Sequence, residues 1–308
     1  MNEVRTFTNT LMRQIDDLNA NAGCPMTTAE KTSALRIIES AQVVLEENRV
    51  DIKWVNWRKS NFKMNVFNFA LLGLNKDDHD FYIVPRKDGK MQPDKNGNMF
   101  QPYTMTLDLQ YQGEEKIIMR YCKKPNGAKV SNILKNVVCE GEKFETSFDF
   151  ATGKTVIKAH EVKDVLARDK TERGIRGAYA IVYFDDGSSI TVVIDKTRIA
   201  RAKQAAMTKN IWNSDYEKMV LKTVVHDLYK ECAKYINTST EINNAIRDIE
   251  KHNDSQEKEE HMEAVDVSYE IKDEPEHEQE KIEAREPVQE IHETAEPPKE
   301  EKEKSWML

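Results

Sequence analysis

A β-hairpin signal at residues 178–194 constrains the fold of this chain more than any other feature. Its sequence, AYAIVYF-DDG-SSITVVI, places two runs rich in β-branched and aromatic residues on either side of Asp185-Asp186-Gly187. A second hairpin is predicted upstream, where KFETSFDF and TVIKAH flank the turn ATGK at residues 151–154. Because hairpin strands pair antiparallel, the middle of the chain is predicted to form antiparallel sheet.

Helical signals lie on both sides of these hairpins. Capping boxes are predicted at Thr27 with Glu30 and at Ser214 with Glu217, and Gly73 is predicted to end a helix. The predicted helices cover about residues 3–19, 27–47, a segment that ends at 72, 114–122, 196–206 and 214–235. Two extended segments, FYIVP and YTMTLDL, enclose a polar loop at residues 86–99. Helices at both ends and strands between them predict an α+β fold with a central antiparallel sheet.

Charge divides the chain at about residue 250. The whole chain carries a net charge of −8, but residues 251–308 alone hold 8 Lys and Arg against 20 Asp and Glu. That segment therefore carries −12, which leaves +4 for residues 1–250. Residues 251–308 are rich in Pro, Glu and Lys and poor in apolar residues, so we predict a disordered acidic tail after a folded domain at residues 1–250.

Apolar residues and cysteines indicate a cytoplasmic protein without membrane contact. No run approaches the ~18 consecutive apolar residues of a membrane helix. The N-terminal MNEVRTFTNTLMRQIDD carries charges where a signal peptide would be apolar. Cys24, Cys122, Cys139 and Cys232 are scattered, which predicts reduced thiols rather than a disulfide framework or a zinc site.

Motifs of nucleotide-binding and hydrolytic enzymes are missing from the sequence. It contains no G-x-x-x-x-G-K-[ST], no G-x-G-x-x-G after a strand and no H-E-x-x-H. His79, His160 and His226 are far apart, and each is interpreted as structural or solvent-facing. Asp and Glu are so abundant that a carboxylate pair for metal-assisted nuclease chemistry stays open. Otherwise the sequence predicts a protein that is not an enzyme and has no catalytic residues.

Two runs without Asp or Glu predict contact with nucleic-acid phosphates, at residues 116–139 and 196–214. Aromatic residues within or beside them are candidates for stacking on bases. The residues predicted to bind DNA from these runs are Tyr111, Arg120, Lys123, Lys124, Lys129, Lys196, Arg198, Arg201, Lys203 and Trp212. The alternative is that two solvated loops are rich in lysine, and the residues alone leave that choice open.

One face of the predicted helix at residues 214–235 can likewise be a DNA-binding face or a merely solvated one. Lys218, Lys222 and Tyr229 lie roughly opposite the apolar stripe of Val220, Val224 and Leu228. Taken alone, such a face is usually only solvated.

Several short motifs occur in a fixed order. The run ALLGLNKDDHDFYIVP is followed by Tyr111-x-Gly113, by VVCEGEKFE, and then by His160 and the hairpin AYAIVYFDDG. The closing stretch W-x-x-D-Y-x-K-M-x-x-K-T precedes NAIRD. In order and spacing, about residues 30–250 resemble the RecT family of phage single-strand annealing recombinases. The resemblance implies that Lys218 and Lys222, at the two matched lysine positions, contact DNA.

The resemblance also implies a function. It indicates a protein that binds single-stranded DNA, forms a homo-oligomer on it as a ring or helical filament, and anneals it into duplex without ATP. No resident cofactor or metal is expected, with Mg²⁺ at most assisting annealing. A phage or prophage origin in a bacterial host and a partner exonuclease are further implications. Two other functions stay open: a single-strand DNA-binding protein that does not anneal, and a phage scaffolding or structural protein.

The predicted acidic tail has three interpretations. It is long and charged enough to compete with DNA for the basic surface where it can reach it. Its apolar end, Trp306-Met307-Leu308, is alternatively a docking segment for a host single-strand-binding protein or an exonuclease. A solubilising role is the third.

Overall fold

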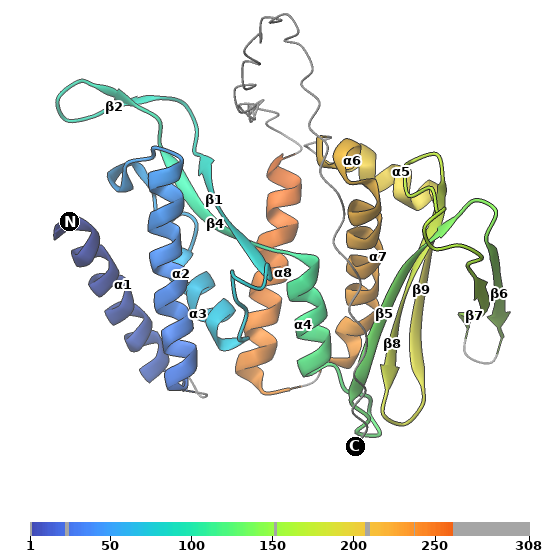
Figure 1. The fold of residues 1–308 in the computed structure, drawn as a ribbon. Coiled ribbons are helices and arrows are strands. Elements are labelled where there is room, and N and C mark those ends of the chain that lie inside the picture. Colours follow the sequence, from blue (N-terminus) through green and yellow to red (C-terminus); the bar gives the residue numbers. More distant parts are fainter. Residues whose placement is uncertain (1, 22–24, 151–152, 207–209, 237, 261–308) are drawn as a thin grey trace, which may run out of the picture. The chain divides into compact units, whose positions relative to one another are not determined.

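The computed structural model describes residues 2–21, 25–150, 153–206, 210–236 and 238–260 (Figure 1). The chain divides into two units, Met1–Ala264 and Val265–Leu308, and every described residue belongs to the first. Helices and antiparallel strands share this unit, which confirms the predicted α+β fold. The predicted domain boundary at residue 250 and the predicted tail stay predictions, since residues 261–308 lie outside the described residues.

The secondary-structure elements follow the predicted order, with additions in several places. The helices are α1 (Asn2–Ala20), α2 (Thr28–Glu47), α3 (Phe62–Leu71), α4 (Tyr111–Tyr121), α5 (Lys196–Ala205), α6 (Asn210–Ser214), α7 (Tyr216–Cys232) and α8 (Thr240–Glu260). The strands are β1 (Phe81–Lys87), β2 (Gln92–Pro93), β3 (Met99–Phe100), β4 (Tyr103–Leu109), β5 (Val130–Cys139), β6 (Lys143–Asp149), β7 (Lys154–Glu161), β8 (Ile175–Phe184) and β9 (Ser189–Asp195). The sequence-based prediction lacks β2, β3, β5, α6 and α8.

Helices α1, α2 and α3 pack against one another. Helix α2 begins at the predicted capping box, where the Thr27 amide donates to Glu30 Oε2 at 2.6 Å and the Glu30 amide donates to Thr27 Oγ1 at 3.3 Å. Helix α3 ends at Leu71, and Gly73 follows with a φ of +64°. This left-handed conformation favours glycine just after a helix, so both predicted helix ends are confirmed.

Strands β1 and β4 pair antiparallel from Phe81 opposite Leu109 to Lys87 opposite Tyr103. Helix α2 packs against β1 and helix α3 against β4, so one face of this pair is buried. The connection between the two strands is predicted as a polar loop. It contains a further short antiparallel ladder, β2 with β3, at the far end of the extension drawn in Figure 1.

Strands β5, β8 and β9 form a three-stranded antiparallel sheet with β8 in the middle. The predicted hairpin is confirmed as β8–β9, in which Tyr183 lies opposite Ser189. Strand β5 pairs with the other edge of β8, with Val137 opposite Ala178. Helix α7 packs against all three strands (Figure 1).

The second predicted hairpin is confirmed as β6–β7, and a buried ionic cluster ties it to the three-stranded sheet. Arg168 Nε donates to Glu142 Oε1 at 2.6 Å, the Cys139 amide donates to Glu142 Oε2 at 2.7 Å, and His160 Nε2 lies 2.9 Å from the same oxygen. The side chains of Glu142, Arg168 and His160 are only 7–8% exposed. The cluster therefore connects the end of β5, strand β7 and the segment before β8.

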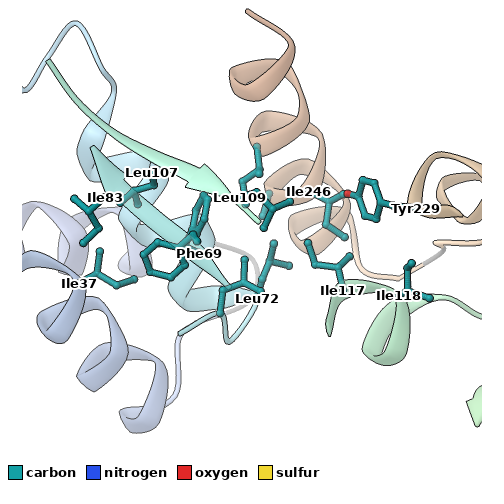
Figure 2. Close-up of a cluster of buried hydrophobic side chains, with 14 of the residues drawn as sticks. Ile37, Phe69, Leu72, Ile83, Leu107, Leu109, Ile117, Ile118, Tyr229 and Ile246 are labelled. Atoms are coloured by element: carbon teal, nitrogen blue, oxygen red, sulfur yellow. The ribbon is translucent and has the colours of Figure 1, made fainter. Parts of the chain in front are cut away.

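A continuous hydrophobic core joins most of these elements. Figure 2 shows Phe69 of α3 and Leu107 of β4 in the same cluster as Ile117 of α4, Tyr229 of α7 and Ile246 of α8. Helix α8 buries three apolar residues, Ala245, Ile246 and Ile249, each at most 5% exposed. The core therefore reaches the predicted domain boundary, and α8 continues past it to Glu260.

The ionic cluster makes stability depend on pH. Burial raises the pKa of Glu142, but hydrogen bonds from Arg168, the Cys139 amide and His160 outweigh burial and leave the pKa below the ordinary glutamate value. A lowered folded-state pKa contributes stability above the unfolded pKa of about 4.3, and this contribution is lost as pH falls through the folded value.

We expect Glu142→Gln to lower the free energy of unfolding by about 3–5 kcal/mol at pH 7, because it leaves the buried Arg168 without its carboxylate. Urea denaturation at pH 7 and at pH 3 measures the difference from the wild type, which should shrink at the lower pH. Glu145→Gln is the control, since Glu145 is 53% exposed. A difference that stays constant with pH would contradict the assignment.

Candidate nucleic-acid interface

Helices α4 and α7 form the frame of the candidate interface. Their apolar residues, among them Ile118 of α4 and Val224 of α7, are fully buried in the common core. Between the helices, His226 Nδ1 lies 2.6 Å from Glu114 Oε1, and Glu114 is 6% exposed. The buried polar contact fixes which side of each helix faces the other.

The N-cap of helix α7 lies one residue after the predicted N-cap, Ser214. The N-cap is Asp215, whose Oδ1 accepts from the Lys218 amide at 3.1 Å. Ser214 belongs to α6, and the Glu217 carboxylate pairs with Lys170 at 3.0 Å. The predicted box of Ser214 and Glu217 is therefore wrong, because the adjacent aspartate caps the helix instead.

Lys218 and Lys222 lie on the part of α7 that stays open. Lys218 is exposed and Lys222 is partly exposed. One turn further along the same side, His226 contacts α4, so the two lysines lie on the α4 side of α7. Tyr229 is 4% exposed and lies in the core beside Ile246 (Figure 2). The predicted solvent-facing stripe is therefore wrong at Tyr229, where the core covers the helix.

Some cations of the first acid-free run have carboxylate partners that are distant in sequence. Lys116 Nζ lies 2.6 Å from Asp80 Oδ2 and 2.8 Å from Asp78 Oδ2. Lys135 forms an ion pair with Glu115 across the contact of β5 with α4. Although the run itself contains no acidic residue, carboxylates from other parts of the chain therefore neutralise some of its lysines.

Arg120 and Lys124 also have partners within the fold. Arg120 Nη1 donates to the carbonyls of Leu72 and Gly73 at 2.8 Å and 3.0 Å, where it satisfies the C-terminal end of α3. Lys124 donates to Ser188 Oγ near the β8–β9 turn. Both side chains hold the fold together in addition to any contact with DNA.

The loop before β5 presents two further lysines. The Lys129 amide donates to Asp185 Oδ1 at 3.0 Å, which ties the loop to the β8–β9 turn. The side chains of Lys123 and Lys129 are exposed, and the two residues form a β-bridge with each other.

The cations of the second acid-free run, residues 196–214, also fall into a paired group and an exposed group. Arg198 binds Asp227 of α7 through two hydrogen bonds, at 2.7 Å and 2.9 Å, and Lys203 Nζ lies 2.7 Å from Glu172 Oε2. These pairs fasten α5 to its neighbours. The other cations of α5, Lys196 and Arg201, are exposed. Lys209, also in this run, lies outside the described residues.

The predicted stacking residues differ in accessibility. Tyr111 is half-buried at the start of α4, Lys135 Nζ lies 4.7 Å from its ring centre, and burial raises the pKa of its hydroxyl. Trp212 is 2% exposed and packs edge-on against Tyr216, with ring centres 5.6 Å apart. The prediction that Trp212 stacks on bases is therefore corrected: its ring belongs to the core.

Six predicted cations remain on the surface with neither an ion pair nor a side-chain hydrogen bond among the described residues: Lys123, Lys129, Lys196, Arg201, Lys218 and Lys222. We call this set the open cations. Charges that are not paired internally are those able to neutralise an external polyanion at no cost in internal contacts.

Cys122, Cys139 and Cys232 are free and buried, and Cys24 lies outside the described residues. Within the described ranges no three His, Cys, Asp or Glu side chains gather as a set of metal ligands. No helix within those ranges has the length and apolar character of a membrane span.

Exposed cations without internal partners are a feature of proteins that bind nucleic acids through the phosphate backbone. The model of the RecT family matches residues 36–265, most of the folded unit and all the predicted DNA-binding residues. The chain belongs to the RecT family, which confirms the resemblance seen in the sequence. It is therefore a DNA-binding protein of the phage-type single-strand annealing class that acts in recombination. No match was found among curated proteins.

Replacing Lys218 and Lys222 together by Ala should weaken binding of a single-stranded oligonucleotide while leaving the unfolding midpoint unchanged. If each lysine contacts one phosphate, the slope of log K against log[salt] should fall by about 1.4 for the two contacts. Fluorescence anisotropy at several salt concentrations measures this slope. The matched control is Lys158→Ala with Lys163→Ala, which removes two exposed lysines outside α4, α5 and α7. A weaker affinity with an unchanged slope would show that Lys218 and Lys222 do not contact phosphates.

Proposed function

We propose that this protein anneals complementary single strands without ATP and without catalysing a covalent step. The observation that carries the proposal is the match of the RecT family over residues 36–265, which includes all six open cations. The absence of a phosphate-binding loop from the sequence is consistent with it.

The mechanism follows from what annealing requires. Two strands repel each other through their phosphates, and lysine or arginine side chains lower that repulsion by replacing condensed counterions. The protein has no need to read sequence, since Watson–Crick pairing selects the partner strand. It must leave the base edges accessible, and contacts through phosphates and base faces do so.

We also propose how the protein assembles, which small ligands it uses and where it acts. The protein works as a homo-oligomer on DNA, in a ring or helical filament, and has no resident cofactor. Mg²⁺ assists by screening phosphates rather than by occupying a protein site. The location of action is the cytoplasm of a bacterial host, as expected for a protein encoded by a phage or prophage, and a partner exonuclease supplies the single strands.

Mixing two complementary labelled oligonucleotides tests the central step. The purified protein should accelerate duplex formation several-fold or more in buffer without nucleotide, and ATP should not change the rate. Tight binding without acceleration would favour a single-strand-binding protein that does not anneal. Absence of salt-dependent binding would favour a scaffolding or structural protein. A requirement for ATP would contradict the proposal.

The tail carries a separate proposal. Residues 251–308 have a net charge of −12 and end in Trp306-Met307-Leu308, which we propose docks on a host single-strand-binding protein. A deletion should start after Glu260, where α8 ends, to keep the buried Ile249 and its helix intact.

Deletion of residues 261–308 should leave annealing of naked DNA unchanged, or faster at low salt because a competing polyanion is gone. Annealing of DNA coated with host single-strand-binding protein should slow down. The control replaces Trp306 and Met307 by Ser in the full chain, which keeps the charge of the tail. It should slow annealing of coated DNA but leave annealing of naked DNA unchanged at every salt concentration. Loss of annealing on naked DNA would show that the tail belongs to the annealing domain.

A further inference from the structure

A third acid-free run lies in the N-terminal half of the chain and was not among those predicted to bind DNA. Residues 52–76 contain no Asp or Glu, and their first half, KWVNWRKSNFK at residues 53–63, interleaves four cations with aromatic residues. Residues 86–101 add four more cations against two aspartates. The segments 52–63 and 86–101 together hold eight cations and two acids, a net charge of +6.

The fold places these two segments side by side. The Asn56 amide donates to the Tyr103 carbonyl at 2.7 Å, and Val55 forms a parallel β-bridge with Tyr103 at the start of β4. Lys59 forms an ion pair with Asp88. The two runs therefore make one surface at the base of the β2–β3 extension.

Aromatic rings at this junction are divided between core and surface. Trp57 packs between Phe7 and Phe62, with ring centres 4.4 Å and 5.0 Å away, and anchors the segment. Trp54 instead stacks on Phe100 of β3, with ring centres 6.0 Å apart and planes inclined by 23°. Trp54 is 37% exposed, so part of the ring is open to solvent.

Other large apolar side chains of the β2–β3 extension are exposed as well. Met91 and Met99, on the two sides of the β2–β3 ladder, are 54% and 56% exposed. Lys87, Lys90 and Lys95 are exposed along the same extension, and no ion pair is seen for them among the described residues. We call Trp54, Phe100, Lys87, Lys90 and Lys95 the extension surface.

The turn of the extension is ordered, not loose. Asp94 Oδ1 accepts from the Asn96 and Asn98 amides, both at 2.8 Å, and Gly97 adopts a φ of +81°. These hydrogen bonds, first that of the Asn98 amide, lower the pKa of Asp94. The backbone that carries Lys95 is therefore held in a defined turn at the tip, which reduces the backbone entropy lost when a ligand binds there.

We propose that the extension surface is a second binding site for single-stranded DNA. A base stacks on the open part of the Trp54 ring, which Phe100 supports from behind, and Lys87, Lys90 and Lys95 contact the phosphates on either side. The excess of cations identifies a polyanion as the ligand, and the aromatic pair identifies one with flat, unpaired bases. The inference rests on the proposed function and assigns it a site built from elements other than α4, α5 and α7.

Photocrosslinking and salt titration test the site in the full-length protein. An oligothymidylate that carries 5-iododeoxyuridine should crosslink to Trp54 or Phe100 on irradiation, as read by peptide mapping. Trp54→Ala should weaken binding by roughly 5- to 150-fold, the range for one lost base stack, and Trp54→Phe should restore most of it. Lys87→Gln with Lys90→Gln and Lys95→Gln should lower the salt slope by up to about 2.

The matched control removes three exposed cations elsewhere, with Arg13→Gln, Lys158→Gln and Lys163→Gln, and should change the slope by much less. If the wild type binds DNA but the extension variants behave like the control and no crosslink forms, this inference fails and the proposed function stands. If the extension variants change only the mass of the oligomer, the surface binds a second copy of the chain and the inference fails as well. If the wild type binds no single-stranded DNA, the proposed function fails and this inference fails with it.

Discussion

The packing of α4 against α7 is the contact on which the rest of the structure depends. Helix α4 bonds through Arg120 to the C-terminal end of α3, and α7 covers the three-stranded sheet, so the contact of α4 with α7 links the N-terminal elements to the sheet. At its centre Glu114 is nearly inaccessible to water and has His226 as its partner at 2.6 Å. A buried carboxylate without a partner is costly, so the pair favours the register that brings His226 to Glu114. That register decides that Lys218 and Lys222 stay open.

Internal pairing of charge determines which cations are available to DNA. Lys116 binds Asp80, and Arg198 binds Asp227, across separations of 36 and 29 residues. Charge runs in the sequence therefore overestimate the basic surface, because the fold brings distant carboxylates to some lysines and arginines. The open cations are those of the predicted DNA-binding cations that remain after that pairing, and Lys87, Lys90 and Lys95 of the extension surface likewise have no ion pair among the described residues. This residual charge, rather than the net charge of the chain, explains how a protein with a net charge of −8 binds a polyanion.

Local signals predicted much of the fold. The β8–β9 and β6–β7 hairpins, the capping box at Thr27 and the helix end at Gly73 depend on residues close together in the chain, and all are present. Strand β5 was missed because its alternating residues were interpreted only as a cationic run. Helix α8 was missed although Ile242, Ala245, Ile246 and Ile249 have helical spacing, since the polar sequence around them resembles the tail.

The candidate site was harder to predict than the fold. Trp212 is buried against Tyr216, and Arg120 of α4 caps the C-terminal end of α3. Both depend on contacts between elements, which the spacing of residues along the chain does not reveal. The run at residues 52–76 does carry a local signal, since it lacks acids and contains Trp54 and Trp57. A search for acid-free runs with interleaved aromatic residues along the whole chain would have found it.

The central claim is that the six open cations bind the DNA. The most direct test is the salt dependence of single-strand binding by a variant in which all six open cations are replaced by Gln. The account predicts a folded protein whose slope of log K against log[salt] is lower than that of the wild type by up to about 4, from six lost phosphate contacts. A folded variant whose slope equals that of the wild type would contradict the claim.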